Sequence, residues 1–313
     1  MYDVLAEVVR NGFVESRHYG SVAGLAPDGT LGYARGDVHA TVLPRSTTKP
    51  FQALACLAAG APLAGEHLAI AAGSHTGEDF HVAATAAILA AAGLGADALQ
   101  CPPAWPEDAP TRAALIRAGE GESRIRMNCS GKHAAMLAAC VAAGWPTGDY
   151  LDPGHPLQRG VRAALGDAAG EEPAPVAVDG CGAPLFGLTL AGLARAAQSL
   201  VLAAGGPGRA VADAMRAHPE YVAGTGHVNT EFMRALPGSV AKGGAEGVLI
   251  AATAQGHAVA VKVIDGSPRA TTAIALRALA ALGADTTPAE PLGTVPVLGG
   301  GRPVGEIRVT EGK

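Results

Sequence analysis

The chain of 313 residues is 49% hydrophobic and only 16% charged, which excludes a disordered chain because apolar burial can offset chain entropy. Its net charge of −5 at pH 7 argues against a nucleic-acid partner, which needs a concentrated basic face. No charge-free apolar stretch reaches the ~18 residues of a membrane helix, and the first residues lack a basic-then-apolar signal. We therefore expect a cytoplasmic protein without a membrane segment.

The first 45 residues are predicted to form an antiparallel meander. Turn residues at Asn11-Gly12, Tyr19-Gly20 and Pro27-Asp28-Gly29 separate short alternating stretches, because Asn-Gly and Asp-Gly tolerate positive φ. The predicted strands are 5–9, 13–18, 21–25, 30–34 and 40–43.

From residue 46 to about 217, Ala and Leu recur at three- and four-residue spacing, which indicates helices separated by Gly or Pro. The predicted helices are 46–59, 79–92, 109–118, 131–143, 156–167, 188–199 and 208–217. Buried strands are predicted at 239–242, 247–252 and 257–265, then a helix over 270–282 and a hairpin of 295–298 with 304–309.

This order of elements predicts an α+β fold in a single unit of residues 1–313. One antiparallel sheet is expected from both chain ends, about 1–45 and 238–313, packed with helices. The middle of the chain, about 46–237, is expected to form a helical lobe.

The strongest local signal for catalytic chemistry is the pair Ser46 and Lys49, which lies where a predicted strand ends and a predicted helix begins. Residues three apart share one helix face, so the lysine could act as the base that a weakly nucleophilic serine needs. Ser-x-x-Lys pairs of this kind occur in serine acyl-enzymes of the penicillin-binding type. Taken alone, however, an ordinary N-cap serine beside an exposed lysine is the better interpretation.

Two further segments could contribute to the same chemistry. Ser74 lies on a polar turn, where it could equally cap the next helix. Lys242 is followed by Gly243 and Gly244 in an apolar strand pair, where glycines would let a ligand approach the strand edge. A lysine that simply points to water at a strand start is at least as common.

The five cysteines are an odd number scattered over a long chain, which is a poor disulfide framework and fits a reducing compartment. Cys129 and Cys181 lie in tight polar turns and could bind zinc as thiolates, with Lys132 or His133 as a third ligand. Unrelated buried cysteines or a reversible disulfide are the more probable interpretation of the spacing alone.

Six motifs occur in order along nearly the whole chain and together resemble the asparaginase II family, the Rhizobium etli inducible type of L-asparaginase. They are Val14–Gly20, Arg45–Gln52, Ser74–Glu78, Asn128–His133, Asp179–Gly182 and Lys242–Gly247. The resemblance implies a fold similar to serine β-lactamases and glutaminases, and hydrolysis of L-asparagine to L-aspartate and ammonia.

The resemblance also implies roles for individual residues. Two Ser–Lys pairs would be catalytic and three residues would hold zinc, while three more would surround the substrate. The implied catalytic residues are Ser46, Lys49, Ser74 and Lys242; the implied zinc ligands are Cys129, Lys132 and Cys181; the implied substrate-binding residues are Arg45, His133 and Asp179. We further expect a homodimer, with L-asparagine as the small-molecule partner.

One departure from the wider fold is Gly243, which stands where penicillin-recognising enzymes carry the Thr of Lys-Thr-Gly, and this counts against a β-lactam substrate. A glutaminase or another serine amidohydrolase of the same architecture is the first alternative. A non-catalytic zinc-thiolate or redox-sensing protein built on Cys129 and Cys181 is the second, and it leaves Ser46 and Lys49 unexplained.

Overall fold

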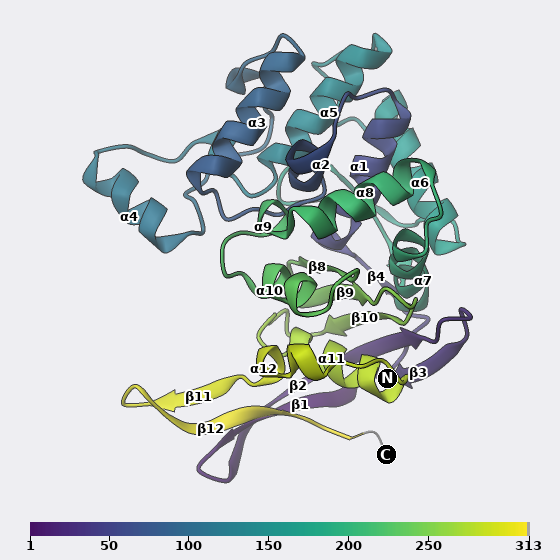
Figure 1. The fold of residues 1–313 in the computed structure, drawn as a ribbon, viewed down its shortest axis with the longest axis vertical. Coiled ribbons are helices and arrows are strands. Elements are labelled where there is room, and N and C mark those ends of the chain that lie inside the picture. The colour runs from purple at the N-terminus through teal and green to yellow at the C-terminus, as the bar shows by residue number, and fades with distance from the viewer. Residues whose placement is uncertain (312–313) are drawn as a thin grey trace.

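The computed structural model describes residues 1–311 and contains an antiparallel sheet of eight strands, which lies beneath most of the helices in the view of Figure 1. Neighbouring strands follow the order β11-β12-β1-β2-β10-β9-β8, and β3 pairs with β2. The strands are β1 (Asp3–Arg10), β2 (Phe13–Leu25), β3 (Leu31–Arg35), β8 (Val240–Gly244), β9 (Val248–Ala252), β10 (Ala258–Val263), β11 (Pro296–Gly299) and β12 (Arg302–Val309). The predicted α+β class, with one sheet built from both chain ends, is confirmed.

One predicted turn is wrong. Tyr19-Gly20 lies inside β2, which continues unbroken for 13 residues. A Cβ on Gly20 would lie 2.0 Å from the carbonyl oxygen of Lys262 in β10, so the glycine permits close strand contact rather than a reversal of the chain.

The helices occupy mainly the middle of the chain. They are α1 (Lys49–Ala58), α2 (Gly65–Ala71), α3 (Asp79–Ala91), α4 (Ala109–Arg117), α5 (Ser130–Ala143), α6 (Pro156–Ala169), α7 (Leu190–Val201), α8 (Gly206–Ala217), α9 (Pro219–Val222), α10 (Val228–Ala235), α11 (Thr271–Ala281) and α12 (Glu290–Gly293). A 3-10 turn, η1 (Arg45–Thr48), leads into α1. In the described part of the chain, no helix is both long and apolar enough to span a membrane.

Helix α5 is the centre of the helical region. Every residue from Ser130 to Cys140 is buried, and α1, α2 and α3 pack around it. A Cβ on Gly131 would lie 2.8 Å from the carbonyl oxygen of Ile70, so α5 begins in close contact with the end of α2. This contact brings the segment before α5 next to the loop that follows α2.

The sheet is covered on both faces at its centre. Every residue of β9 is buried, although successive side chains of a strand point to opposite faces. Helices α7 and α11 pack on β2, β9 and β10 and supply this cover. Strand β8 ends the sheet, and η1 lies against it. The first turn before α1 is thereby held beside the strand that carries Lys242.

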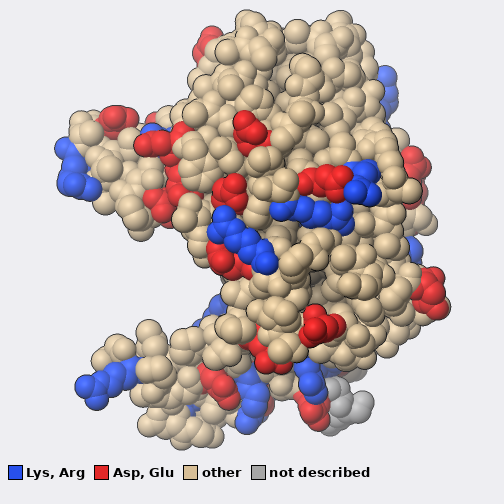
Figure 2. Space-filling view, viewed as in Figure 1, with Lys and Arg blue, Asp and Glu red and all other residues tan. Residues whose placement is uncertain are grey.

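Two small two-stranded sheets complete the fold. β4 (Thr41–Val42) pairs with β7 (Leu188–Thr189), and β5 (Val176–Val178) pairs with β6 (Pro184–Phe186). The turn between β5 and β6 carries Asp179 and Cys181. Figure 2 shows acidic and basic side chains interspersed on one face, which is hollowed between the part that carries α4 and the β11–β12 hairpin.

Candidate active site

Three of the four lysines among residues 1–311 are almost completely buried: Lys49, Lys132 and Lys242 have exposed fractions of 1%, 2% and 1%. Lysine is almost never fully buried unless its ammonium group has partners. Each of the three buried lysines contacts a residue that the sequence marked as a candidate for chemistry.

Lys49 and Lys242 meet at one hydroxyl group. Lys49 Nζ donates to Ser74 Oγ at 2.8 Å, and Lys242 Nζ lies 2.9 Å from the same oxygen. Lys49 Nζ also donates to the carbonyl oxygen of Asn128 at 3.2 Å. The loop between α2 and α3 holds Ser74 in place, because its backbone N–H donates to the carbonyl oxygen of Val222 at 2.8 Å.

The pairs expected from the sequence are therefore joined differently. Ser74 and Lys242 are in contact, whereas Lys49 reaches Ser74 rather than Ser46. Ser46 lies on the wall of the same cavity, and within residues 1–311 its hydroxyl group makes no side-chain hydrogen bond. The arrangement is one serine held between two lysines, with a second serine beside them.

Burial lowers the pKa of Lys242 well below that of an ordinary lysine, and the positive charge of Lys49 lowers it further. A larger share of Lys242 is therefore a free amine near neutral pH. Such an amine can accept a proton that a solvated ammonium group could not.

The backbone around Ser46 is tightly arranged. Arg45 has a φ of 51°, in the left-handed region that non-glycine residues rarely adopt. A Cβ on Gly244 would lie 3.1 Å from both the carbonyl oxygen of Pro44 and the backbone nitrogen of Ser46. Gly244 thus lets β8 approach the turn that carries Ser46. The close approach that was expected for a ligand at this glycine is made by the protein's own backbone.

Ser46, Ser74 and Lys242 face a cavity of about 560 Å³. Its wall includes Ser46, Ser74, Lys242, Glu107, Asn128, His227, Asn229 and Arg269, with further residues of β8, β9 and α11. Of these, Glu107, Asn128, His227, Asn229 and Arg269 were not singled out from the sequence. Asn128 alone carried a signal, since it opens the Asn128–His133 motif, and its Nδ2 donates to Glu107 Oε1 at 2.7 Å.

A second buried cluster lies next to the first. Lys132 Nζ donates to Cys181 Sγ at 2.9 Å, and Cys181 Sγ lies 3.7 Å from Asp179 Oδ2. Arg45 Nε donates to Asp179 Oδ1 at 2.7 Å. The neighbouring Cys181 holds the pKa of Cys129 well below that of an ordinary thiol, and the charges of Lys49 and Lys132 lower it further. The structure thus brings together Cys129, Lys132 and Cys181.

The donor set of this cluster fits a thiophilic ion such as zinc. Two cysteine sulfur atoms and a buried amine are groups that such an ion accepts, provided the lysine loses its proton. No cluster of three or more His, Cys, Asp or Glu side chains with metal-binding geometry occurs among residues 1–311. The third ligand that the family resemblance implies, Lys132, is of none of these types. The adjacent His133 is fully buried, and its Nε2 has no partner among the described residues.

His75 forms hydrogen bonds that fix the loop carrying Ser74. Its Nδ1 accepts a hydrogen bond from the backbone N–H of Gly77 at 3.2 Å, so the proton is on Nε2, which lies 2.9 Å from Ser130 Oγ. Burial lowers the pKa of His75 well below its usual value, and the neighbouring His81 and Lys49 lower it further. The ring is therefore neutral in the folded protein.

This state of His75 predicts acid sensitivity. In the unfolded chain His75 takes up a proton near pH 6.5, but in the folded chain it does so only at lower pH. The contribution of neutral His75 to the stability of the fold is therefore complete above about pH 6.5, and it is lost as the pH falls from 6.5 to the folded pKa. In that window His75 adds a slope of about 1.4 kcal/mol per pH unit to the free energy of unfolding. Denaturant unfolding between pH 7.5 and 4.5 should show a shallower loss for His75→Gln than for the exposed control His39→Gln; equal slopes would contradict this account.

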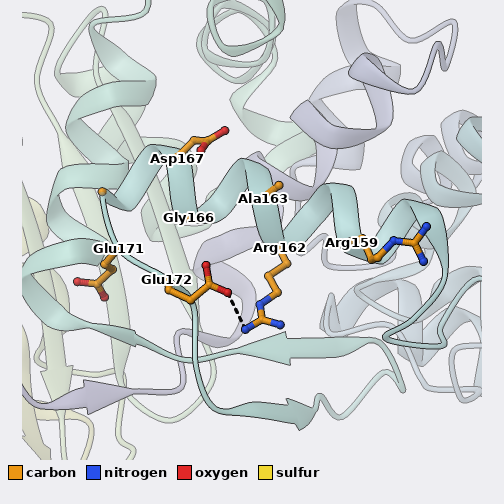
Figure 3. A pocket seen from close by; sticks show the side chains of 8 residues that line it. Arg159, Arg162, Ala163, Gly166, Asp167, Glu171 and Glu172 are labelled. Atoms are coloured by element: carbon orange, nitrogen blue, oxygen red, sulfur yellow. Dashed lines mark ion pairs between the residues drawn. The ribbon is translucent and has the colours of Figure 1, made fainter.

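A second hollow runs along α6 (Figure 3), where Arg162 Nη2 and Glu172 Oε1 form an ion pair at 2.8 Å. Its lining consists of arginine, acidic, glycine and alanine residues and includes none of the serines, lysines or cysteines described above. The chemistry is thus concentrated at the cavity beside β8.

The family model described as L-asparaginase II matches residues 6–309, so the chain belongs to the L-asparaginase II family. The resemblance read from the six motifs is confirmed, and membership supports an amidohydrolase at the family level. No sequence among the curated proteins matches the chain. A solved structure described as "Crystal Structure Analysis of Mglu" is similar with a TM-score of 0.44 and 14% identity, over 87% of this chain and 67% of that one.

Proposed function

We propose that the protein is an L-asparaginase that hydrolyses L-asparagine to L-aspartate and ammonia by serine acyl transfer. The observation that carries the proposal is the Ser74 hydroxyl group held between two buried lysines, in a cavity shared with Ser46. Family membership supports the amide substrate. We further propose that the enzyme acts in the cytoplasm as a homodimer, and its five free cysteines fit a reducing compartment.

In the proposed reaction, Lys49 in its neutral form turns from Ser74 toward Ser46 and takes its proton, and Ser46 Oγ attacks the side-chain amide carbon. Once protonated, Lys49 returns to the contact with Ser74 that the structure shows. The contacts of Ser74 with both lysines support a proton relay from Lys49 through Ser74 to Lys242 and on to the departing ammonia. Water then hydrolyses the ester and returns the proton to Ser46. Backbone N–H groups at the start of η1 and α1 would stabilise the oxyanion, an effect often worth about 3 kcal/mol per donor.

Arg45, His133 and Asp179 would serve the acyl side of the substrate. The Arg45–Asp179 ion pair at 2.7 Å joins the turn before Ser46 to the turn that carries Cys181. Cys129, Lys132 and Cys181 would hold a zinc ion, which supplies positive charge that orients a carboxylate group or a water molecule beside Asp179.

The direct test is ammonia release by purified protein from L-asparagine and, in parallel, from L-glutamine, with and without added zinc. Turnover of asparagine in preference to glutamine supports the proposal. Preferential release from glutamine favours the glutaminase alternative, and no release from either substrate would refute the proposed function.

Zinc binding can be tested independently of turnover. We expect purified protein to contain about one zinc per chain and to lose it, with a lower Tm, in the presence of a chelator. Cys181→Ser should bind far less zinc, because it removes one of two sulfur ligands, whereas the control Cys140→Ser, on the same α5 helix as Lys132, should retain it. Metal analysis of the two dialysed variants is the measurement, and equal zinc content would contradict the assignment.

A further inference from the structure

The cavity is larger than L-asparagine requires. Its volume of about 560 Å³ lies in the range of ~300–1,000 Å³ of sites that enclose drug-sized ligands. Hydrolysis of a primary amide releases only ammonia, which needs no such space. The wall continues beyond the catalytic candidates to a distal part formed by Pro268, Arg269, Thr271, Thr272, Leu292 and Val295.

The distal part contains an arginine that a buried histidine holds in place. Arg269 Nε donates to His18 Nε2 at 2.9 Å, and His18 Nδ1 lies 2.6 Å from Asp265 Oδ2. Because arginine only donates, Nε2 of His18 accepts and its Nδ1 carries the proton, which it donates to Asp265. His18 is 2% exposed, so the guanidinium group rests on a rigid support.

This contact also explains a motif that the catalytic residues leave unused. His18 belongs to the Val14–Gly20 segment, which carries the resemblance to the family but contributes no residue to the wall of the cavity. In β2 the segment is pinned against β10, because Gly20 allows the two backbones to meet closely. His18 is thereby fixed beneath Arg269.

The proposed chemistry sets the direction in which a substrate would extend. Ser74 and Lys242 deliver the proton to the departing nitrogen, and both line the cavity together with Arg269. Arg45, His133 and Asp179, assigned to the acyl side, are not part of the described lining. A group attached to the departing nitrogen would therefore lie toward Arg269, whose planar guanidinium group matches a carboxylate.

We propose that the enzyme also cleaves β-aspartyl peptides, in which the side-chain amide nitrogen belongs to a second amino acid, and that Arg269 binds the carboxylate of that departing amino acid. This inference rests on the proposed function. Ser46 Oγ bonds to the β-carbonyl carbon, the C–N bond breaks, and the nitrogen takes the relayed proton and leaves as a free amine. Water then cleaves the ester, so that one water is consumed and aspartate and the second amino acid are released.

The test compares β-aspartyl-alanine with β-aspartyl-alanine amide, which lacks only the carboxylate of the departing group. Wild-type enzyme should release product from the acid with a kcat/KM about 10- to 100-fold above that of the amide, as a hydrogen-bonded charge pair would give. Arg269→Gln should bring this ratio close to one, mainly through KM, and His18→Gln should lower it in part. The exposed Arg277, which pairs with Glu311, provides the control Arg277→Gln, which should keep the wild-type ratio.

The outcomes separate the two proposals. If wild-type protein hydrolyses asparagine but neither peptide, or if Arg269→Gln keeps the wild-type ratio, the inference is wrong and the proposed function stands. If wild-type protein hydrolyses none of the substrates, the proposed function fails. Calorimetric titration of the protein with the two peptides then tests the inference separately. The inference requires that β-aspartyl-alanine binds more tightly than its amide and that Arg269→Gln loses this difference.

Discussion

Replacing Ser46 by alanine is expected to lower kcat/KM for L-asparagine by at least about 10³-fold while leaving the fold intact, because the variant lacks the attacking oxygen. Ser46 Oγ makes no side-chain hydrogen bond within the described residues, so its removal leaves no buried group without a partner. Ammonia release and thermal unfolding, measured on the same preparation, check both parts of this prediction.

Ser199→Ala provides the matched control. Ser199 lies on α7, where its hydroxyl group donates to the carbonyl oxygen of Ala196 at 2.8 Å, and it does not line the cavity. The control should retain full activity. A Ser46→Ala enzyme that works at more than a tenth of the wild-type rate would show that the nucleophile lies elsewhere.

Lys242→Met is expected to lower kcat by about 10²- to 10⁴-fold, the usual contribution of general acid–base catalysis. Lys242 has to be unprotonated to accept the relayed proton, so wild-type kcat/KM should rise with pH as this amine loses its proton and then level off. Burial and Lys49 lower the pKa of Lys242, which places the rise well below the 10.5 of an ordinary lysine.

The pH profile separates a chemical role from a structural one. Methionine matches much of the aliphatic length of lysine without its charge, so Lys242→Met should fold and should lose the rising limb assigned to Lys242. The half-buried Lys262 of β10 provides the control Lys262→Met, which should keep this limb. An unchanged rising limb in Lys242→Met would mean that another group titrates.

Much of the fold could be predicted from the sequence. The alternation of apolar residues and the spacing of Ala and Leu indicated most strands and helices, and the return of β structure near residue 239 indicated a sheet from both chain ends. Tyr19-Gly20 was misread as a turn because glycine serves equally where two strands come close. Helix α10 (Val228–Ala235) was missed because eight residues give too little periodicity.

The sequence indicated which residues form the candidate site but not which of them contact one another. The motifs indicated Ser46, Lys49, Ser74 and Lys242, yet the spacing of Ser46 and Lys49 could not show that Lys49 reaches across to Ser74. That contact depends on the packing of α2 against α5, which involves residues far apart in the chain. Arg269 had no local signal, since only the strand register places His18 beneath it.

The central claim is that Ser46 becomes acylated by the substrate. The most direct measurement is mass spectrometry of peptides from enzyme quenched with acid during turnover of L-asparagine. The account predicts an added aspartyl group, carried as an ester on the peptide that contains Ser46 and absent from Ser46→Ala. An adduct on the peptide that contains Ser74, or active turnover without any adduct under conditions where hydrolysis of the ester is slow, would contradict it.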